Sequence, residues 1–157
     1  MPSTHKKVIV RKLSRDSISG YVTAVDFVSE GKLELLNTSG NLVRIELAEV
    51  KAVYFVRDFQ ESDVVRKTFT TRPRTEGLWV RLNFRDQDIL EGLIPNDLNQ
   101  LPSEGYLITP PDTRGNTQRV FVPRAALQSI SVLAVIGGMQ RQRRAKPAAE
   151  QPQLFGE

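Results

Sequence analysis

The second half of the chain repeats the pattern of the first half. Three pairs of segments carry the repeat: 18–22 (Ile-Ser-Gly-Tyr-Val) with 89–93 (Ile-Leu-Glu-Gly-Leu), 43–53 with 120–130, and Arg15-Asp16 with Arg85-Asp86. A repeat of this size indicates that one structural unit occurs twice. Because loops tolerate insertions, we expect a tandem duplication whose loops are longer in the second copy.

Within each copy, apolar residues alternate with polar ones. Leu33 and Leu35 lie on one face of a predicted strand, and Val43, Ile45 and Leu47 lie on one face of the next. This period of two is typical of half-buried strands. The run 37–41 (Asn-Thr-Ser-Gly-Asn) suits a hairpin turn. The alternation breaks for about one turn at Ala48-Glu49 and at 123–126, where we expect a short 3₁₀ step. Each copy is therefore expected to hold about five strands.

Five short strands with one apolar face are best covered by curling into a small barrel. Gly20 and Gly92 fall inside strand patterns, where glycine usually marks a sharp bend. We expect an all-β protein with the following organisation: a first barrel at 6–58, a linker at 59–76, a second barrel at 77–136 and a disordered basic tail at 137–157. In the linker, Val64, Val65 and Phe69 are candidate docking residues.

The stretch 20–26 (Gly-Tyr-Val-Thr-Ala-Val-Asp) resembles the Gly-x-hydrophobic-x-x-x-Asp stretch of Sm/LSm-like small β-barrels. The resemblance implies two tandem five-stranded Sm-like barrels. Sm-type RNA binding uses an Asn shortly after this Asp and an Arg-Gly pair at the break before the last strand. Here these places read Phe27-Val28-Ser29-Glu30-Gly31 and Leu47-Ala48-Glu49-Val50, and the second copy has only Arg124-Ala125 at the break. We therefore expect the barrel to carry over and the uridine pocket not to.

The run 51–59 (Lys-Ala-Val-Tyr-Phe-Val-Arg-Asp-Phe) also resembles a segment of uncharacterised bacterial domains, some of which are joined to signalling proteins. That resemblance implies a small bacterial accessory domain and no particular activity. The PilZ signature for cyclic dinucleotides, Arg-x-x-x-Arg followed by Asp/Asn-x-Ser-x-x-Gly, is not matched by Arg72-Pro73-Arg74 or by the run 16–20.

The residue inventory argues against an enzyme. The chain has no cysteine and a single histidine, His5, in a terminal segment. The chain therefore offers almost no side chain that could act as a general base near neutral pH, and almost none for a metal site built from histidine or cysteine. Asp16, Asp86 and Asp88 fall between strands, where Asp commonly forms turns. Phosphate-binding glycine motifs are not found either, so we expect no cofactor and no small-molecule substrate.

The sequence also bears on the location of the chain and on the role of its aromatic residues. We place the chain in the cytoplasm, with no membrane segment, because it lacks cysteine and long apolar runs. Tyr21, Tyr54, Trp79 and Tyr106 lie within alternating patterns, which favours packing over base stacking.

The formal net charge is +4, and the tail holds four basic and two acidic residues. Nucleic-acid binding, to RNA or another polyanion, is therefore the alternative function. Its candidate contacts are Arg11, Lys12, Arg81, Arg85, Arg124, Arg141, Arg143, Arg144 and Lys146.

The function that we favour from the sequence is a non-catalytic binding or assembly module. Strand edges of small barrels are ready templates for pairing with another chain. We therefore expect a protein partner or self-association through edge strands. The candidate edges are Val43–Leu47, Val50–Val56, Val120–Val122 and Leu127–Val132.

Overall fold

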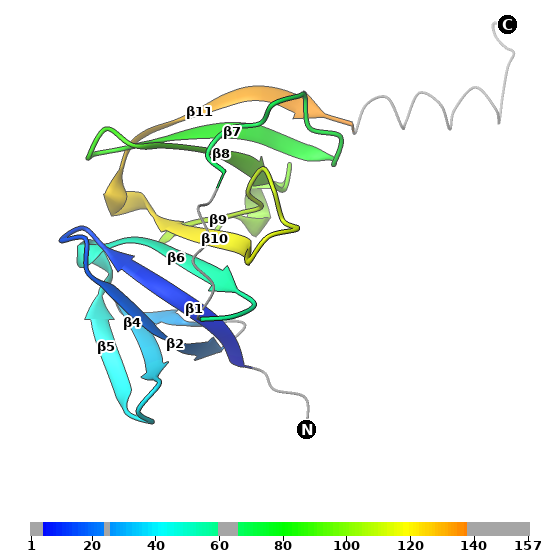
Figure 1. Ribbon diagram of the computed structural model, residues 1–157. Coiled ribbons are helices and arrows are strands. Elements are labelled where there is room, and N and C mark those ends of the chain that lie inside the picture. Colours follow the sequence, from blue (N-terminus) through cyan, green and yellow to red (C-terminus); the bar gives the residue numbers. More distant parts are fainter. Residues whose placement is uncertain (1–4, 24–25, 60–65, 138–157) are drawn as a thin grey trace, which may run out of the picture.

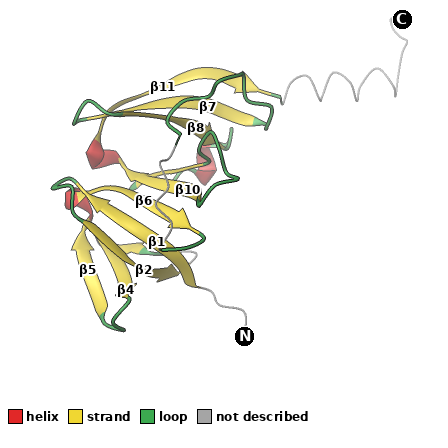
Figure 2. Ribbon diagram, in the orientation of Figure 1, coloured by secondary structure: helices red, strands yellow, loops and turns green. Residues whose placement is uncertain are grey.

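The computed structural model describes residues 5–23, 26–59 and 66–137 and shows an all-β protein. The strands of the first half are β1 (His5–Lys12), β2 (Ser17–Thr23), β3 (Val28–Ser29), β4 (Lys32–Asn37), β5 (Leu42–Glu46) and β6 (Val50–Val56). Those of the second half are β7 (Gly77–Phe84), β8 (Ile89–Ile94), β9 (Gly105–Ile108), β10 (Thr117–Pro123) and β11 (Leu127–Ile136). Three short 3₁₀ turns complete the described elements: η1 (Leu47–Glu49), η2 (Leu98–Gln100) and η3 (Arg124–Ala126) (Figure 2). The expected 3₁₀ steps before the last strand of each half are thus present.

The strands form two antiparallel sheets. The larger has the order β3-β4-β2-β1-β6-β10-β9, with β5 paired to β4, and the smaller has the order β11-β7-β8. A single bridge between Leu93 and Thr109 links β8 to the segment after β9. In Figure 1 the sheet of β7, β8 and β11 lies above the strands of the first half, with β9 and β10 between them. The all-β class is confirmed, whereas closure of each half into a separate five-stranded barrel is not, because the sheets are open.

Both halves place their strands in the same way. In the first half β6 and β2 flank β1, and in the second half β11 and β8 flank β7. Gly20 lies opposite Val8, and Gly92 lies opposite Val80. The turns match too, because the Lys12 N–H donates to the Asp16 carbonyl and the Phe84 N–H donates to the Asp88 carbonyl.

This register corrects part of the expected alignment. Asp16 corresponds to Asp88, so the recurring Arg-Asp pair at Arg85-Asp86 is a coincidence of composition. Likewise Trp79 corresponds to Lys7, because each lies one residue before the residue opposite the glycine. The first two strands of the second half therefore align with those of the first half without an extra residue.

The apolar side chains form two core clusters, one in each half. The first is built mainly from β1, β2, β4, β5 and β6, and the second mainly from β7, β8, β9, β10 and β11. Each cluster also contains one residue from the other half. Phe121 of β10 belongs to the first core, and Ala52 of β6 belongs to the second. The two halves are therefore packed together through β6 and β10.

Candidate functional site

Strand β11 has an uncharged edge exposed to solvent. It runs for ten residues with the sequence LQSISVLAVI. In the described part of the chain it is hydrogen-bonded on one side, to β7. Val132 is 59% exposed, and Leu133 and Val135 are exposed as well. Soluble proteins usually protect such an edge with charges, proline or a covering element. An unprotected apolar edge of this length is typical of a site that pairs with another strand.

The equivalent strand of the first half shows how such an edge looks when it is covered. Strand β6 lies between β1 and β10, and its side chains are largely buried. Phe55 of β6 lies opposite Val8, as Val132 lies opposite Val80, so the two residues are equivalent. Phe55 is half-buried, whereas Val132 is 59% exposed. Leu133, which is 38% exposed, falls at a register shift between Val132 and Ala134. Among the described residues no strand takes the place beside β11 that β10 takes beside β6, and the exposure of β11 follows from this.

Strand β5 is the second such edge. Among the described residues its hydrogen-bonding partner is β4, in a register that places Leu42 opposite Leu36. Leu42 is 63% exposed, and Leu36 is also exposed. Its equivalent in the second half is β10, which pairs with β9 on one side and with β6 on the other.

The pairing of β6 with β10 therefore joins the two remaining edges within one molecule. Phe121 lies opposite Val53, Val120 opposite Tyr54 and Arg119 opposite Phe55. The ring of Phe121 also meets Phe27 edge to face, with the ring centroids 5.1 Å apart. Of the four edges expected from the sequence, two thus pair with each other and two, in β5 and β11, stay open. Sequence reasoning missed Leu42, Leu133 and Val135, although the uncharged run 127–136 was a signal for the last two.

A charged cluster ties β6 to the turn between β7 and β8. The Lys51 ammonium lies 2.8 Å from Asp86 and 2.9 Å from Asp88, and Lys67 lies 2.6 Å from Asp88. Burial lowers the pKa of Lys51, but its hydrogen bonds to both carboxylates outweigh burial and raise that pKa overall. For Asp88, burial acts to raise the pKa, yet hydrogen bonds from Lys67 and Lys51 bring it from 3.8 to about 2. The aspartates thus serve as partners for lysines, which suits a structural role.

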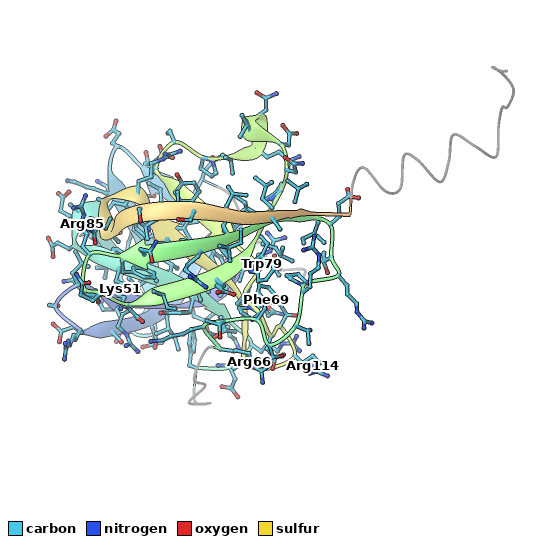
Figure 3. All side chains as sticks on the ribbon, turned by 90° about the horizontal axis from the view of Figure 1, so that it is seen from above. Lys51, Arg66, Phe69, Trp79, Arg85 and Arg114 are labelled. Atoms are coloured by element: carbon cyan, nitrogen blue, oxygen red, sulfur yellow. The ribbon has the colours of Figure 1, made fainter. Side chains whose placement is uncertain are left out.

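A second cluster holds the segment 66–76 against the outer face of β7 and β8. The buried Glu91 carboxylate accepts hydrogen bonds from Arg81 at 2.7 Å, from the Trp79 indole at 3.3 Å and from the Phe69 backbone N–H at 3.2 Å. The Glu91 N–H donates to the Lys67 carbonyl. Phe69 meets Trp79 edge to face (Figure 3), with the ring centroids 5.8 Å apart. Phe69 therefore docks, while Val64 and Val65 lie outside the described residues.

Burial also affects the pKa of the Glu91 carboxylate. It acts to raise the pKa of Glu91, but the hydrogen bonds from Arg81, Phe69 and Trp79 outweigh it and hold the pKa below its usual range. Glu91 is thus a paired anion and not a proton donor.

The structure brings two candidate nucleic-acid contacts, Arg11 and Lys12, together in one groove, and Arg81, Arg85 and Arg124 do not line it. Arg81 pairs with buried Glu91, and Lys12 lies 3.3 Å from Glu49. Arg85 donates to the Ala125 carbonyl, and Arg124 stacks over the Tyr106 ring at 4.8 Å. Arg11 lines a groove that also contains Asp86 and Asp88. Arg141, Arg143, Arg144 and Lys146 lie outside the described residues, as does all of the tail after Gly137. Contact of these nine residues with nucleic acid stays a prediction.

The other predicted aromatic residues pack. Tyr54 is largely buried, which raises its pKa. Tyr106 belongs to the second core, and Tyr21 meets Phe59 edge to face at 5.4 Å. The ring of Trp79 packs against the ring of Phe69.

The described residues include no group of three or more His, Asp or Glu side chains placed to hold a metal ion. A search of the same residues for a helix able to cross a membrane found none.

Comparison with known proteins gave one match. The sequence model of a family of unknown function, DUF6982, matches residues 4–134. No curated protein and no solved structure matches the chain.

Proposed function

The chain belongs to DUF6982, a family of unknown function, and we propose that it is a non-catalytic assembly module that joins protein chains through the edges of β5 and β11. The observation that carries this proposal is the contrast between two equivalent strands. Strand β6 is buried between two neighbours, whereas β11 presents Val132, Leu133 and Val135 to solvent without a charge in its whole length. Adding a strand there would satisfy backbone groups and cover apolar side chains.

We further propose that each half derives from one small barrel unit of the Sm-like type. Three features support this: the repeated order of strands, the 3₁₀ turns η1 and η3 directly before the last strands, and one core cluster for each half. In this proposal each barrel unit has opened at one edge. β6 of the first unit pairs there with β10 of the second, so that one continuous sheet crosses both units.

The charges of the described residues favour a protein partner over a nucleic acid. A nucleic-acid site needs several cations on one face. The groove beside Arg11 is also lined by Lys12, Arg15 and Lys51, together with Asp86 and Asp88. Of these cations, Lys12 faces Glu49 and Lys51 faces both aspartates, and Arg81 outside the groove faces Glu91. The apolar edge of β11 has no such competing partner among the described residues.

A photo-crosslinking amino acid placed at 132, 42 or 98 tests the proposal in the native cells. Leu98 on η2 is a matched control, because it is 79% exposed but lies on neither edge. We expect protein adducts from 132 and 42 and only background from 98. Equal protein labelling at the three positions would overturn the proposal, and adducts to RNA or DNA instead would favour the nucleic-acid alternative.

A further inference from the structure

The molecule contains a template for its own assembly. Inside one chain, the last strand of the first half, β6, pairs with β10, the strand just before the last one of the second half. The two edges left over, β11 and β5, are the equivalents of β6 and β10. A free equivalent of each partner in the joint is therefore present: β5 lies beside β4 in the larger sheet, and β11 lies at one end of the smaller sheet.

The repeat fixes which residues correspond. Phe55 and Val132 lie opposite Val8 and Val80, while Val53 and Ile130 lie opposite Val10 and Leu82. One register shift recurs at the same place, between Arg11 and Lys12 in one half and between Leu127 and Ser129 in the other. The pairing of β11 with β7 has a second shift, between Val132 and Ala134, so the correspondence is used up to Val132.

The same comparison relates β10 to β5. Val120 of β10 lies opposite the buried residue Ile108, and Val43 of β5 lies opposite the buried residue Leu35. One residue earlier in each strand, Arg119 of β10 is thus equivalent to Leu42 of β5.

Transferring the observed register to the open edges gives a specific contact. Because Arg119 lies opposite Phe55 inside the chain, Leu42 of one molecule would lie opposite Val132 of the next. These are the large apolar side chains that β5 and β11 expose most, at 63% and 59%. The register of the internal pairing of β6 with β10 thus brings two exposed aliphatic residues together. This match indicates that the two open edges are complementary.

We propose that the partner of β11 is β5 of a second copy of this chain, paired antiparallel with Leu42 opposite Val132. This inference rests on the proposed function and names its partner. The interface is head to tail, so each copy keeps one open edge and further copies add until a ring closes or a filament grows.

The contact between copies should be weaker than the internal joint. Phe121, which belongs to the first core, is replaced at the equivalent place in β5 by Arg44. Arg44 is already paired with Glu34 at 3.2 Å. The association therefore adds Leu42 and Val132 contacts without a buried aromatic ring, and we expect it to depend on protein concentration.

Site-specific crosslinking tests the register. The chain has no cysteine, so Leu42→Cys and Val132→Cys can be placed on separate full-length chains and joined with a short thiol crosslinker. We expect a covalent dimer from the mixture and little from either variant alone. Val132→Cys chains that crosslink to each other would show β11 paired with β11 and overturn the proposal. Leu98→Cys mixed with Val132→Cys is the control for random collision.

Blocking one edge at a time tests the head-to-tail arrangement. In the wild type, sedimentation should show mass rising with concentration. Leu42→Lys and Val132→Lys should each weaken self-association about tenfold or more, because each places a charge where an aliphatic side chain would be buried. Mixed together they should form a species of two chains, since one keeps β11 and the other keeps β5. Leu98→Lys should behave as wild type.

The two proposals fail differently. A wild type that stays monomeric at all concentrations overturns the second copy as partner. If photo-crosslinks from 132 in cells then reach another protein, the assembly function stands with a different occupant. If they reach no protein, both proposals fall.

Discussion

Gly92 occupies a place where a side chain does not fit. A Cβ atom there would lie 2.0 Å from Cγ2 of Ile108 and 2.8 Å from the carbonyl oxygen of Thr109. Gly20, its equivalent, would bring a Cβ atom to 2.5 Å from the Leu36 carbonyl oxygen. β2 thus presses onto β4, and β8 onto β9 and the residue after it, which is the close approach expected from glycine within a strand pattern.

We predict that Gly92→Ala lowers the free energy of unfolding by about 1–3 kcal/mol, because overpacking forces the backbone or Ile108 to shift. Urea unfolding at neutral pH measures this. Gly20→Ala should cost a similar amount if the halves are built alike. A Gly92→Ala protein as stable as the wild type would show that β8 and β9 are not in close contact.

Trp79 is the single tryptophan of the chain and reports on the segment that covers it. We predict that Phe69→Ala shifts the tryptophan emission to longer wavelength, because removal of the ring lets water reach the indole. Phe59→Ala is the matched control, since Phe59 packs on Tyr21 in the other half. An unchanged emission maximum in Phe69→Ala would contradict docking of this segment.

Asp88 makes stability depend on acid. Its pKa is depressed from 3.8 to about 2, so its stabilising effect is complete above about pH 4 and is lost as the pH falls toward 2. The shift corresponds to about 2 kcal/mol by proton linkage. We predict that Asp88→Asn unfolds at lower urea concentration at pH 7 and that its difference from the wild type shrinks between pH 4 and pH 2. A difference that stays constant over this range would contradict the ion pairs with Lys51 and Lys67.

At the scale of the elements, much of the strand pattern could be predicted from the sequence. The period of two located the strands, and the breaks at 48–49 and 123–126 located the 3₁₀ turns before β6 and β11. The alignment of the first strands was wrong because Arg85-Asp86 imitates Arg15-Asp16, while the backbone hydrogen bonds equate Asp16 with Asp88. A turn is defined by its backbone geometry, and Arg15 and Gln87, both with positive φ, occupy the equivalent places.

Phe121 and Arg44 are equivalent residues with different surroundings, and they offer a matched pair of substitutions. Phe121 is buried in the first core, whereas Arg44 is exposed. We predict that Phe121→Ala costs about 3–5 kcal/mol, as for other buried aromatic residues, and that Arg44→Ala costs less than about 0.5 kcal/mol in the monomer. Thermal and urea unfolding at low protein concentration measure both. Similar costs for the two would contradict the packing of β10 onto the first half.

At the scale of the whole molecule, the sequence indicated two similar units but not how they join. Alternation shows which face of a strand is buried, but it does not name the strand that lies beside an edge. Residues 50–56 and 120–122 were therefore expected as open edges, like 43–47 and 127–132. The structure pairs the first two with each other, and the difference lies in a few side chains such as Phe121 and Ala52, which each enter the core of the other half.

This shared packing predicts that the two halves unfold together. The larger sheet runs without interruption from β3 to β9 across both halves, and removal of either half would expose the paired residues of the other, 53–56 in β6 or 117–121 in β10. Unfolding followed by Trp79 fluorescence, which senses the second half, should therefore coincide with unfolding followed by far-ultraviolet circular dichroism, which senses all strands. Phe121→Ala should separate the two transitions, because it weakens the first core and the joint together. Two separate transitions in the wild type would show instead that the halves are independent units, and that the pairing of β6 with β10 contributes little to stability.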